Sequence, residues 1–505
     1  MSSWPDAVTF ARSWAHSVSA RADEPFLVFE APDATVTEWT YGEFDVVVAR
    51  MATELTSHDV GPGASVHLAL TNCPTFVAVW IAANRLGAWI VPSDPMGRAP
   101  ELADHIERTA PVVGFCSRER IDEYEPAAGD IALFRVDETD ADFDWLPVEA
   151  FADWPEPAPT DRAAVMFTSG TTGRPKGVEI TQANYAFAGK TMAEAAALTP
   201  DDRQLVVLPL FHANAQYYSF ASAIWAGASV ALMHTFSASG FLPQAARHRA
   251  TCASLFAAPL RMILARGGPV EGLALRHCWF AQNITPDQYA IVSDWFGCRP
   301  RQLYGMTETI PAVLTDAADR PDCSSMGYVT RGCEVDVHDG DSRQVAIDEV
   351  GEIVVRGDRG ITLFAGYLDD PITTEANFRG EWFLTGDRAR RDADGRFFFD
   401  GRRSDVLKVA GENVSTVEVE AVVTAHPAVL EASVVGAPDA VRDEVPVAFV
   451  VPIDASDPPS NDELTAWCAE RLGKAKVPRE FTILDELPRT SVGKIRKFLL
   501  KEAVR

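Results

Sequence analysis

Residues 166–177 read MFTSGTTGRPKG, and this stretch decides how the rest of the chain is interpreted. It holds three glycines, four hydroxyl side chains and one lysine directly after an apolar run. Glycine adopts backbone angles that other residues avoid, and successive N–H groups in such a loop form an anion-binding nest. With the hydroxyls of Ser169, Thr171 and Thr172 and the cation of Lys176, the stretch predicts a polyphosphate-binding loop.

The loop differs from a Walker A loop, whose pattern is G-x-x-x-x-G-K-[ST]. Gly170 and Gly173 lie too close together for that pattern, and Gly177 follows Lys176. A lone glycine-rich stretch is equally compatible with a plain tight turn. The density of hydroxyls and the lysine favour phosphate binding over that alternative.

Composition excludes several classes of function. The chain has 505 residues and a formal net charge of −27, and so large an acidic protein repels nucleic acids. It contains no apolar run of about 18 residues, and its first residues lack the pattern of a signal peptide. Its eight cysteines are scattered, without a C-x-x-C pair. We therefore expect a cytoplasmic protein with free thiols and no membrane partner.

The order of apolar segments predicts the architecture. Runs at residues 64–70, 88–92, 205–210 and 253–259 resemble buried strands, with helical spacing between them, which indicates a parallel sheet with crossover helices. A chain of 505 residues is expected to form more than one domain. We predict an α/β fold with an N-terminal domain over residues 1–402, its part from about 327 to 402 forming a β-rich subdomain. A small α+β domain over residues 403–505 follows.

The C-terminal end carries an unusual charge. From Arg471 to Arg505 there are ten basic and four acidic residues, although the whole chain is acidic. This pattern is compatible with a solvated helix face. It is also compatible with a small basic surface that meets an anionic ligand.

Four further stretches complete the pattern: LPLFHANAQYY (208–218), LYGMTET (303–309), FLTGD (383–387) and PRTSVGKIRK (488–497). Singly, His212, Glu308, Asp387 and Lys494 have ordinary structural explanations. Together and in this order, the stretches resemble the adenylate-forming superfamily of acyl-CoA synthetases, nonribosomal adenylation domains and beetle luciferases. The YGMTETI, GENVS and DAVRDE stretches are most similar to carnitine/crotonobetaine-type and related small-acid CoA ligases.

The resemblance covers nearly the whole chain and implies a two-step reaction. A carboxylate attacks the α-phosphate of Mg-ATP and expels pyrophosphate, and a thiol, usually that of coenzyme A, then displaces AMP. Such chemistry depends on charge neutralisation and alignment. The resemblance implies ATP, Mg²⁺ and coenzyme A as cofactors and substrates, a hinge before a mobile C-terminal domain, and a monomer or homodimer.

The resemblance also implies the residues that contact the nucleotide. Thr307 contacts the α-phosphate, and Glu308 holds Mg²⁺, an ion that prefers oxygen ligands. Asp387 takes hydrogen bonds from both ribose hydroxyls with help from Arg402, and Tyr304 stacks on adenine. The implied nucleotide-binding set is Thr168, Ser169, Gly170, Thr171, Thr172, Gly173, Lys176, Tyr304, Gly305, Asp387 and Arg402.

The C-terminal domain supplies the mobile groups in this scheme. Lys494 bridges the substrate carboxylate and the nucleotide, and its arrival and departure need a hinge. The hinge falls on Ser404, where the family commonly has Asp or Lys. The region of Gly411 forms one wall of the pantetheine tunnel, and Lys474 and Lys476 are candidates for contact with coenzyme A phosphates.

The expected acid pocket is polar and aromatic, which favours a small or aromatic acid over a long alkyl chain. The resemblance implies that His212 lies beside the carboxylate, where it positions the acid or gates the thiol. The stretch FHANAQ lacks the aspartate that holds an α-ammonium, so ordinary amino acids are disfavoured. The other expected lining residues are Asn214, Gln216, Tyr217, Phe280, Ala281, Gln282, Gly305, Met306, Thr309 and Ile310.

Three functions remain open at this point. An acid–CoA ligase is favoured. The same fold could use another acceptor or another acid: a carrier-protein thiol could take the acyl group, or nitrite could be activated with ATP to diazotise an aromatic amine in secondary metabolism. A non-catalytic nucleotide-binding protein is disfavoured, because such a protein has no physical need for Lys494, Glu308 and Asp387 together.

Overall fold

The computed structural model describes residues 9–168, 175–402, 406–409, 412–439, 442–489 and 495–504. The chain forms two compact units. The first comprises the residues up to Cys323 with Gly327–Val335 and Val355–Phe383, and the second comprises Ser324–Met326, Asp336–Val354 and the residues from Leu384 onward. The second unit thus includes parts of the segment expected to be a β-rich subdomain, and the boundary at residue 402 stays a prediction.

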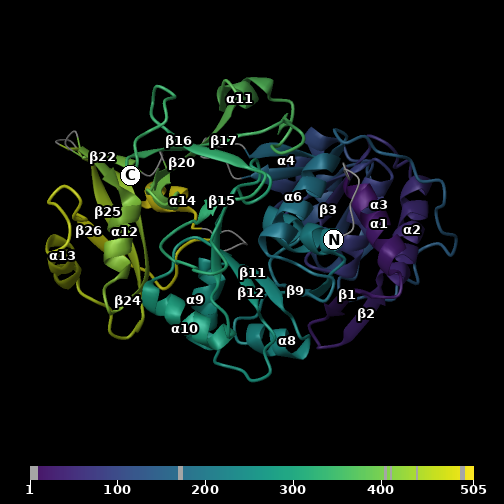
Figure 1. The fold of residues 1–505 in the computed structure, drawn as a ribbon, viewed down its shortest axis with the longest axis horizontal. Helices are drawn as coiled ribbons and strands as arrows, with labels where there is room; N and C mark the ends of the chain where they lie inside the picture. The colour runs from purple at the N-terminus through teal and green to yellow at the C-terminus, as the bar shows by residue number, and fades with distance from the viewer. Residues whose placement is uncertain are drawn as a thin grey trace. The chain divides into compact units, whose positions relative to one another are not determined.

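One sheet of the first unit carries most of the expected site (Figure 1). Its central strands are parallel and almost entirely buried, as the apolar runs predict, so the α/β class is confirmed. The run at residues 205–210 leaves the ladder after Val206, ahead of Pro209, which has no N–H to donate. In sheet order the strands are β15 (Tyr328–Val329), β14 (Leu314–Thr315), β13 (Arg301–Tyr304), β12 (His277–Ala281), β11 (Cys252–Phe256), β9 (Arg203–Val206), β10 (Ser229–Met233), β1 (Pro25–Glu30) and β2 (Val36–Thr40).

Two sets of helices pack on this sheet. One hydrophobic cluster joins β11 and β12 to α8 (Phe241–Arg247), α9 (Ala257–Arg266) and α10 (Pro286–Phe296) (Figure 1). The π-helix η2 (Asn214–Ala221) packs against β9, β11 and α6 (Gln182–Ala195), and continues into α7 (Ser222–Ala226). The alternation of side chains along each strand separates the residues that meet these two sets.

A second sheet of the first unit carries the glycine-rich stretch between β7 and β8, which form an antiparallel hairpin. In sheet order its strands are β18 (Gly366–Tyr367), β8 (Lys176–Thr181), β7 (Arg162–Thr168), β4 (Trp89–Pro92), β3 (Ser65–Ala69), β5 (Val113–Ser117) and β6 (Ala132–Val136). The other helices of this unit are α1 (Phe10–Arg21), α2 (Tyr41–Ser57), α3 (Pro74–Arg85), α4 (Ala99–Thr109), η1 (Arg118–Arg120), α5 (Ile121–Ala128) and α11 (Pro371–Ala376).

The segment after residue 333 is rich in strands, as the alternating pattern predicts. It contains β16 (Glu334–His338), β17 (Val350–Arg356), β19 (Phe378–Arg379), β20 (Trp382–Arg391) and β21 (Phe397–Arg402). The chain then forms a sheet of β22 (Val406–Val409), β23 (Glu412–Ser415), β24 (Val429–Asp439), β25 (Asp443–Pro452) and β26 (Glu480–Ile483) with α12 (Thr416–Thr424), α13 (Asn461–Ala469) and α14 (Lys497–Ala503). Side chains alternate along the β24–β25 hairpin between two hydrophobic clusters.

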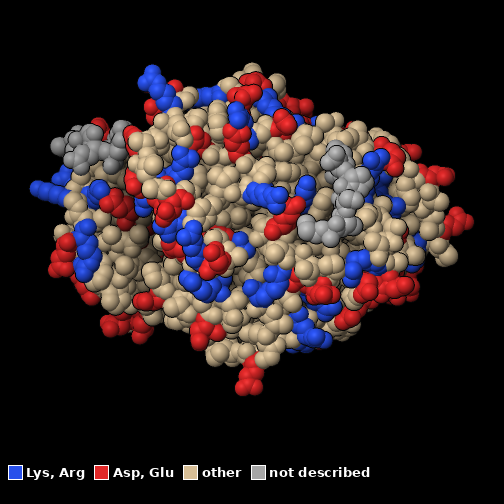
Figure 2. Space-filling view, viewed as in Figure 1, with Lys and Arg blue, Asp and Glu red and all other residues tan. Residues whose placement is uncertain are grey.

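Charged side chains of both signs lie on the face of the molecule drawn in Figure 2. Figure 2 shows basic and acidic side chains interspersed over the visible face, without a continuous basic region. No described helix is both long and apolar enough to cross a bilayer.

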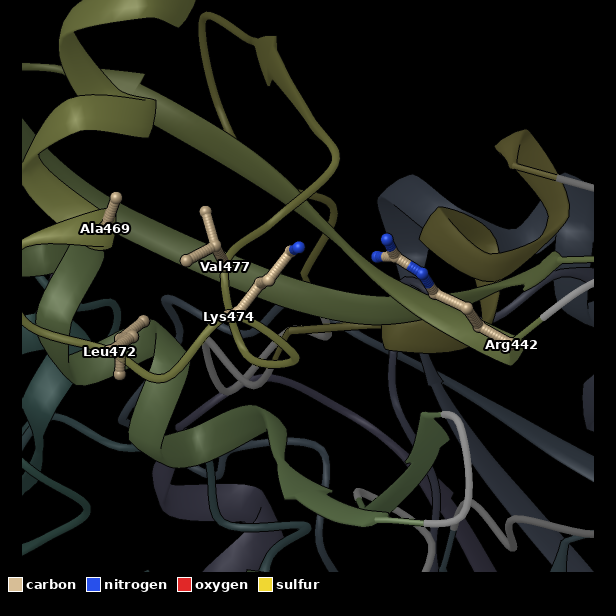
Figure 3. Close-up of a pocket in the computed structure, with 5 residues that line it drawn as sticks. All are labelled: Arg442, Ala469, Leu472, Lys474 and Val477. Carbon is tan, nitrogen blue, oxygen red and sulfur yellow. The ribbon is translucent and has the colours of Figure 1, made fainter.

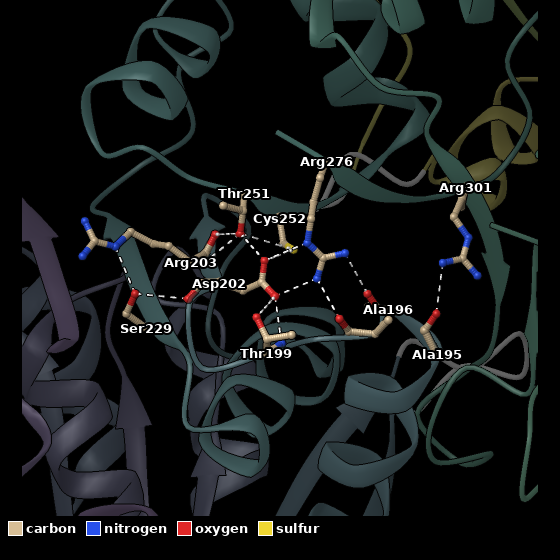
Figure 4. A network of polar contacts seen from close by, with 11 residues as sticks. Ala195, Ala196, Thr199, Asp202, Arg203, Ser229, Thr251, Cys252, Arg276 and Arg301 are labelled. Atoms are coloured by element: carbon tan, nitrogen blue, oxygen red, sulfur yellow. Dashed lines mark hydrogen bonds and ion pairs between the residues drawn. The ribbon is translucent and has the colours of Figure 1, made fainter. Parts of the chain in front are cut away.

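A buried carboxylate joins the amino-terminal ends of the parallel strands (Figure 4). Asp202, directly before β9, accepts hydrogen bonds from Arg276 Nε at 2.8 Å and Nη2 at 2.7 Å, and from Thr251 Oγ1 at 2.7 Å. Thr251 precedes β11 and Arg276 precedes β12. The Asp202 carbonyl accepts from the N–H of Ser229, the first residue of β10. Burial by itself raises the pKa of Asp202, but the hydrogen bonds from Arg276, Thr251 and Thr199 outweigh it and hold the pKa below its usual range.

We predict that Asp202→Asn lowers the melting temperature by several degrees, because it leaves the Arg276 guanidinium without its anionic partner. The folded pKa is depressed, so the stabilisation is complete above the unfolded pKa and is lost as the pH falls. The difference in melting temperature between wild type and Asp202→Asn should therefore be constant near neutrality and should become smaller below about pH 4. Thermal unfolding followed by circular dichroism at several pH values measures it. Asp201→Asn changes the exposed neighbour and is the matched control.

Candidate active site

The register of the parallel strands brings several predicted site residues to one edge of the first sheet. Phe256 at the end of β11 pairs with Ala281 at the end of β12, and Phe280 pairs with Gln302 of β13. The carboxyl ends of these strands are thus level with one another. The loops that leave them carry residues 207–213, 282–285 and 305–313. Ligands of open α/β sheets bind at this edge.

The π-helix η2 begins in the loop that follows β9. His212 lies just before it, with its ring centroid 4.2 Å from that of Phe211. Asn214 is the first residue of η2 and only 5% exposed, and neither polar atom of its amide has a hydrogen-bond partner among the described residues. Short π-helical segments occur frequently at functional sites.

Gln216 and Tyr217 have their polar groups engaged inside the protein. The Gln216 amide donates to the Leu210 carbonyl at 2.6 Å and accepts from the Tyr185 hydroxyl. The Tyr217 hydroxyl contacts the sulfur of Met166 at 3.9 Å. Both side chains are fully buried, and their place in the acid pocket stays a prediction.

The site residues predicted at the end of β12 differ in burial. Phe280 is buried in the hydrophobic cluster with α8, α9 and α10, and its ring centroid lies 6.2 Å from that of Tyr289. Ala281 is partly exposed at the sheet edge. Gln282 is exposed with φ of +75°, and its carbonyl accepts from Gln302 Nε2 at 2.8 Å.

The YGMTET stretch forms a compact turn after β13, which ends at Tyr304. Gly305 has no room for a side chain, because a Cβ there would lie 2.8 Å from Ala312 Cα. The Thr309 hydroxyl accepts from the Met306 N–H at 3.0 Å and is within 3.1 Å of the Pro311 carbonyl. These contacts hold the turn.

Within that turn, Met306 and Thr307 are partly exposed. Tyr304 and Ile310 are buried.

Glu308 and Lys176 both contact the side chain of Tyr367. The Tyr367 hydroxyl donates to Glu308 Oε1 at 3.0 Å, and Lys176 Nζ lies 4.6 Å from the centroid of the Tyr367 ring, a cation–π distance. Glu308 is only 4% exposed. Burial, followed by the Glu308 charge, raises the pKa of Tyr367, so its hydroxyl remains protonated and can donate.

Backbone pairing fixes this arrangement. Tyr367 of β18 pairs with Val178 of β8, and the Leu368 N–H donates to the Gly177 carbonyl at 2.8 Å. The sequence analysis did not single out Tyr367, because its only signal is a tyrosine in AGYLDD and its partners lie far away in sequence. The hairpin register sets Thr168 opposite Lys176, across the start of the glycine-rich loop.

Asp387 and Arg402 come together within the second unit. They face each other on β20 and β21, and Arg402 Nε lies 2.9 Å from Asp387 Oδ1. Asp387 is 4% exposed. The remaining predicted residues lie outside the described residues: Ser169, Gly170, Thr171, Thr172, Gly173, Ser404, Gly411 and Lys494.

The chain matches two protein-family models over most of its length. Residues 14–368 match the AMP-binding enzyme model, and residues 418–494 match the model of the AMP-binding enzyme C-terminal domain. The chain therefore belongs to the AMP-binding enzymes, the adenylate-forming superfamily that its motifs predict. It is an AMP-forming acid–thiol ligase of the acyl-CoA synthetase type. The predicted fold, with a large N-terminal and a small C-terminal domain, is confirmed.

Individual relatives agree with this assignment. A crotonobetaine/carnitine–CoA ligase of Salmonella paratyphi C (strain RKS4594) is 32% identical over 506 residues, which cover 97% of this chain and 98% of the relative. The structure of the O-succinylbenzoate coenzyme A synthetase MenE from Bacillus subtilis with AMP has a TM-score of 0.84 and 29% identity, covering 97% and 98% of the two chains. The anthranilate CoA ligase AuaEII with anthranoyl-AMP has a TM-score of 0.88, 24% identity and coverage of 99% and 98%, and shows a shared fold.

We predict that Tyr367→Phe raises the Mg²⁺ concentration needed for half-maximal activity by about tenfold, as is usual when a carboxylate that holds a metal loses its supporting hydrogen bond. The ring under Lys176 is kept, so only the contact with Glu308 is lost. ATP–pyrophosphate exchange titrated with Mg²⁺ measures the shift. Tyr289→Phe, which removes a hydrogen bond of 2.7 Å to the Pro300 carbonyl, is the control. Superimposable Mg²⁺ curves for Tyr367→Phe and wild type would contradict the prediction.

Proposed function

We propose that this ligase activates a small or aromatic carboxylic acid with Mg-ATP and transfers the acyl group to coenzyme A. An oxygen of the carboxylate bonds to the α-phosphorus, and the bond to pyrophosphate breaks. The coenzyme A thiol then loses its proton to solvent, its sulfur bonds to the carbonyl carbon, and AMP leaves. The observation that carries the proposal is the contact of buried Glu308 and Lys176 with one tyrosine, at the edge where the YGMTET turn leaves the sheet.

The chemistry of Glu308 fits a magnesium ion. Mg²⁺ is usually bound by one or two carboxylates together with substrate phosphates. Glu308 is one such carboxylate and is only 4% exposed. When bound, the ion neutralises charge on the phosphate oxygens. Glu308 would hold it, and Lys176 would add a second cation for the phosphates.

Other described residues have roles that agree with the proposal. The partly exposed Thr307 follows the Gly305–Met306 backbone and offers a hydroxyl to the α-phosphate. His212, also partly exposed, stands at the same edge of the sheet to position the carboxylate. In the second unit, Asp387 is already oriented by Arg402 to accept the two ribose hydroxyls.

The relatives support a compact acid. Crotonobetaine, carnitine, anthranilate and O-succinylbenzoate, named for the relatives above, are small or aromatic acids with polar substituents. The segment that follows His212 carries the polar side chains of Asn214 and Gln216, which suits an acid with polar substituents.

The C-terminal unit offers a place for the nucleotide part of coenzyme A. A cavity of about 360 Å³ is lined by Ala469, Leu472 and Val477 and by two cations, Arg442 and Lys474. Figure 3 shows the ammonium group of Lys474 and the guanidinium of Arg442 directed toward each other. An apolar floor beside two cations suits a purine that carries phosphates.

Lys476, the other lysine considered for this role, makes a salt bridge with both carboxylate oxygens of Glu418 at 2.7 Å. The structure therefore favours Lys474 as the lysine that meets coenzyme A.

A product screen tests the proposal. The enzyme is given Mg-ATP, a panel of small, aromatic and amino-aromatic acids, and coenzyme A, nitrite or neither, and products are identified by mass spectrometry. An acyl-CoA product with AMP and pyrophosphate is the expected result. AMP formation that requires nitrite and yields a diazo product would instead establish nitrite activation and diazotisation of an aromatic amine. Adenylate without any acceptor product would indicate a carrier-protein thiol.

We predict that Lys494→Ala retains ATP binding and loses most adenylation, because the cation at the transition state is removed. The prediction rests on the family motif. Equilibrium ATP binding and ATP–pyrophosphate exchange separate the two effects, and Lys501→Ala on α14 is a control for loss of C-terminal charge. Undiminished exchange in Lys494→Ala would overturn the mechanism.

We predict that Lys474→Ala raises the KM for coenzyme A by about tenfold, the loss expected for one charge-assisted hydrogen bond to a phosphate. The exchange reaction without coenzyme A should change little. Steady-state acyl-CoA formation measures the KM, and Lys476→Ala is the matched control on the same loop. An equal rise in the two variants would show that the cavity is not the nucleotide site.

A further inference from the structure

Asn214 is a buried amide that the protein itself does not use. It is 5% exposed, yet Oδ1 and Nδ2 have no hydrogen-bond partner among the described residues. Buried polar side chains are nearly always paired, because an unpaired one loses its hydrogen bonds to water and receives none in return. An orphaned donor and acceptor on one side chain therefore require an explanation.

Other buried amides beside the same loop show the ordinary situation. Asn72 donates to the carbonyls of Leu208 and Met233 at 3.1 Å and accepts from the Leu210 N–H at 2.8 Å. Gln216, two residues beyond Asn214, is also paired at both ends of its amide. These two amides hold the loop that leads into η2. The loop is thus fixed without Asn214, whose amide has no part in holding the described structure.

Further unpaired polar groups lie on the face of the sheet next to η2. Ala253 and Leu255 of β11 point into the cluster with α8, α9 and α10, so Ser254 between them points to the other face. Cys278 and Phe280 of β12 also point into that cluster, so Trp279 between them points to the same face as Ser254. The hydroxyl of Ser254 and the indole N–H of Trp279 are buried and have no partner among the described residues. The π-helix η2 packs against β11 and has no residue in that cluster.

We infer that Asn214 selects acids that carry a neutral group able both to donate and to accept a hydrogen bond, such as a hydroxyl, apart from the reacting carboxylate. This inference rests on the proposed acid activation. A hydroxyl donates to Oδ1 and accepts from Nδ2, and so satisfies both atoms of the amide. A second carboxylate satisfies Nδ2 alone, and an ammonium group satisfies Oδ1 alone. Asn214 lies two residues after His212 in the segment that leaves β9 at the carboxyl-terminal edge of the sheet.

The test compares acids that differ only by a hydroxyl in place of a methyl group. The pairs are the ortho, meta and para hydroxybenzoates with the corresponding methylbenzoates, and 3-hydroxybutyrate with 3-methylbutyrate. The kcat/KM of ATP–pyrophosphate exchange is measured for wild type, Asn214→Leu and Asn214→Ala. Wild type should favour the hydroxyl member of at least one pair by about tenfold or more, since a site that hydrogen-bonds a substrate hydroxyl discriminates strongly against its absence. In both variants that ratio should fall to near one.

Thermal unfolding without substrate supplies a second measurement. Asn214→Leu should keep or raise the melting temperature, because it removes an unpaired buried amide. Gln216→Leu should lower the melting temperature, because it breaks two hydrogen bonds.

The outcomes are distinguishable. Exchange with the panel acids but an unchanged hydroxyl preference in the Asn214 variants would overturn this inference and leave the proposed function standing. A melting temperature that falls in Asn214→Leu as much as in Gln216→Leu would also overturn it, because the amide would then be structural. Exchange with no carboxylic acid would overturn the proposed function and this inference with it.

Discussion

The buried carboxylate of Asp202 is the constraint from which the geometry of the first unit follows. It joins the segments that begin β9, β10, β11 and β12 through Arg276, Thr251 and its own carbonyl. Parallel strands that start level also end level, because each residue advances a strand by nearly the same distance. The loops bearing His212, Gln282 and the YGMTET turn therefore leave the sheet at one edge. The hydrogen-bonded cluster of Asp202 lies at the amino-terminal edge of this sheet, and the loops that carry the predicted site residues lie at the opposite edge.

A short strand then connects that edge to the glycine-rich hairpin. The two residues of β18 pair with β8, and the Phe364 N–H, just before β18, donates to the Glu308 carbonyl at 3.0 Å. Tyr367 thereby meets the carboxylate on one side and the lysine of the hairpin on the other. Two groups of opposite charge thus contact the same tyrosine side chain.

The sequence predicts this site unevenly, and the reason is the range of each interaction. The fold class and the loops that carry the motifs follow from local apolar runs and from residue order, so both could be predicted. Gln216, Tyr217 and Phe280 are predicted pocket residues, and whether each side chain faces a ligand depends on the register of a π-helix and on sheet alternation, which residue identity does not reveal. Tyr367 could not be found at all, since its importance arises from pairing with strands distant in sequence. The pairing of Lys476 with Glu418 is likewise a tertiary contact.

The three amides around residue 210 show how stability and recognition are separated in one short segment. Asn72 and Gln216 form hydrogen bonds with backbone groups of the loop, and Gln216 also with the Tyr185 hydroxyl. These bonds fix where η2 begins. Asn214 keeps both of its polar atoms unpaired at a cost in folding free energy. A fold that only needed to be stable would be better served there by an apolar side chain. The retained cost is therefore an argument that the partner of Asn214 comes from outside the chain, and that the rigid segment around it exists to hold that amide in position.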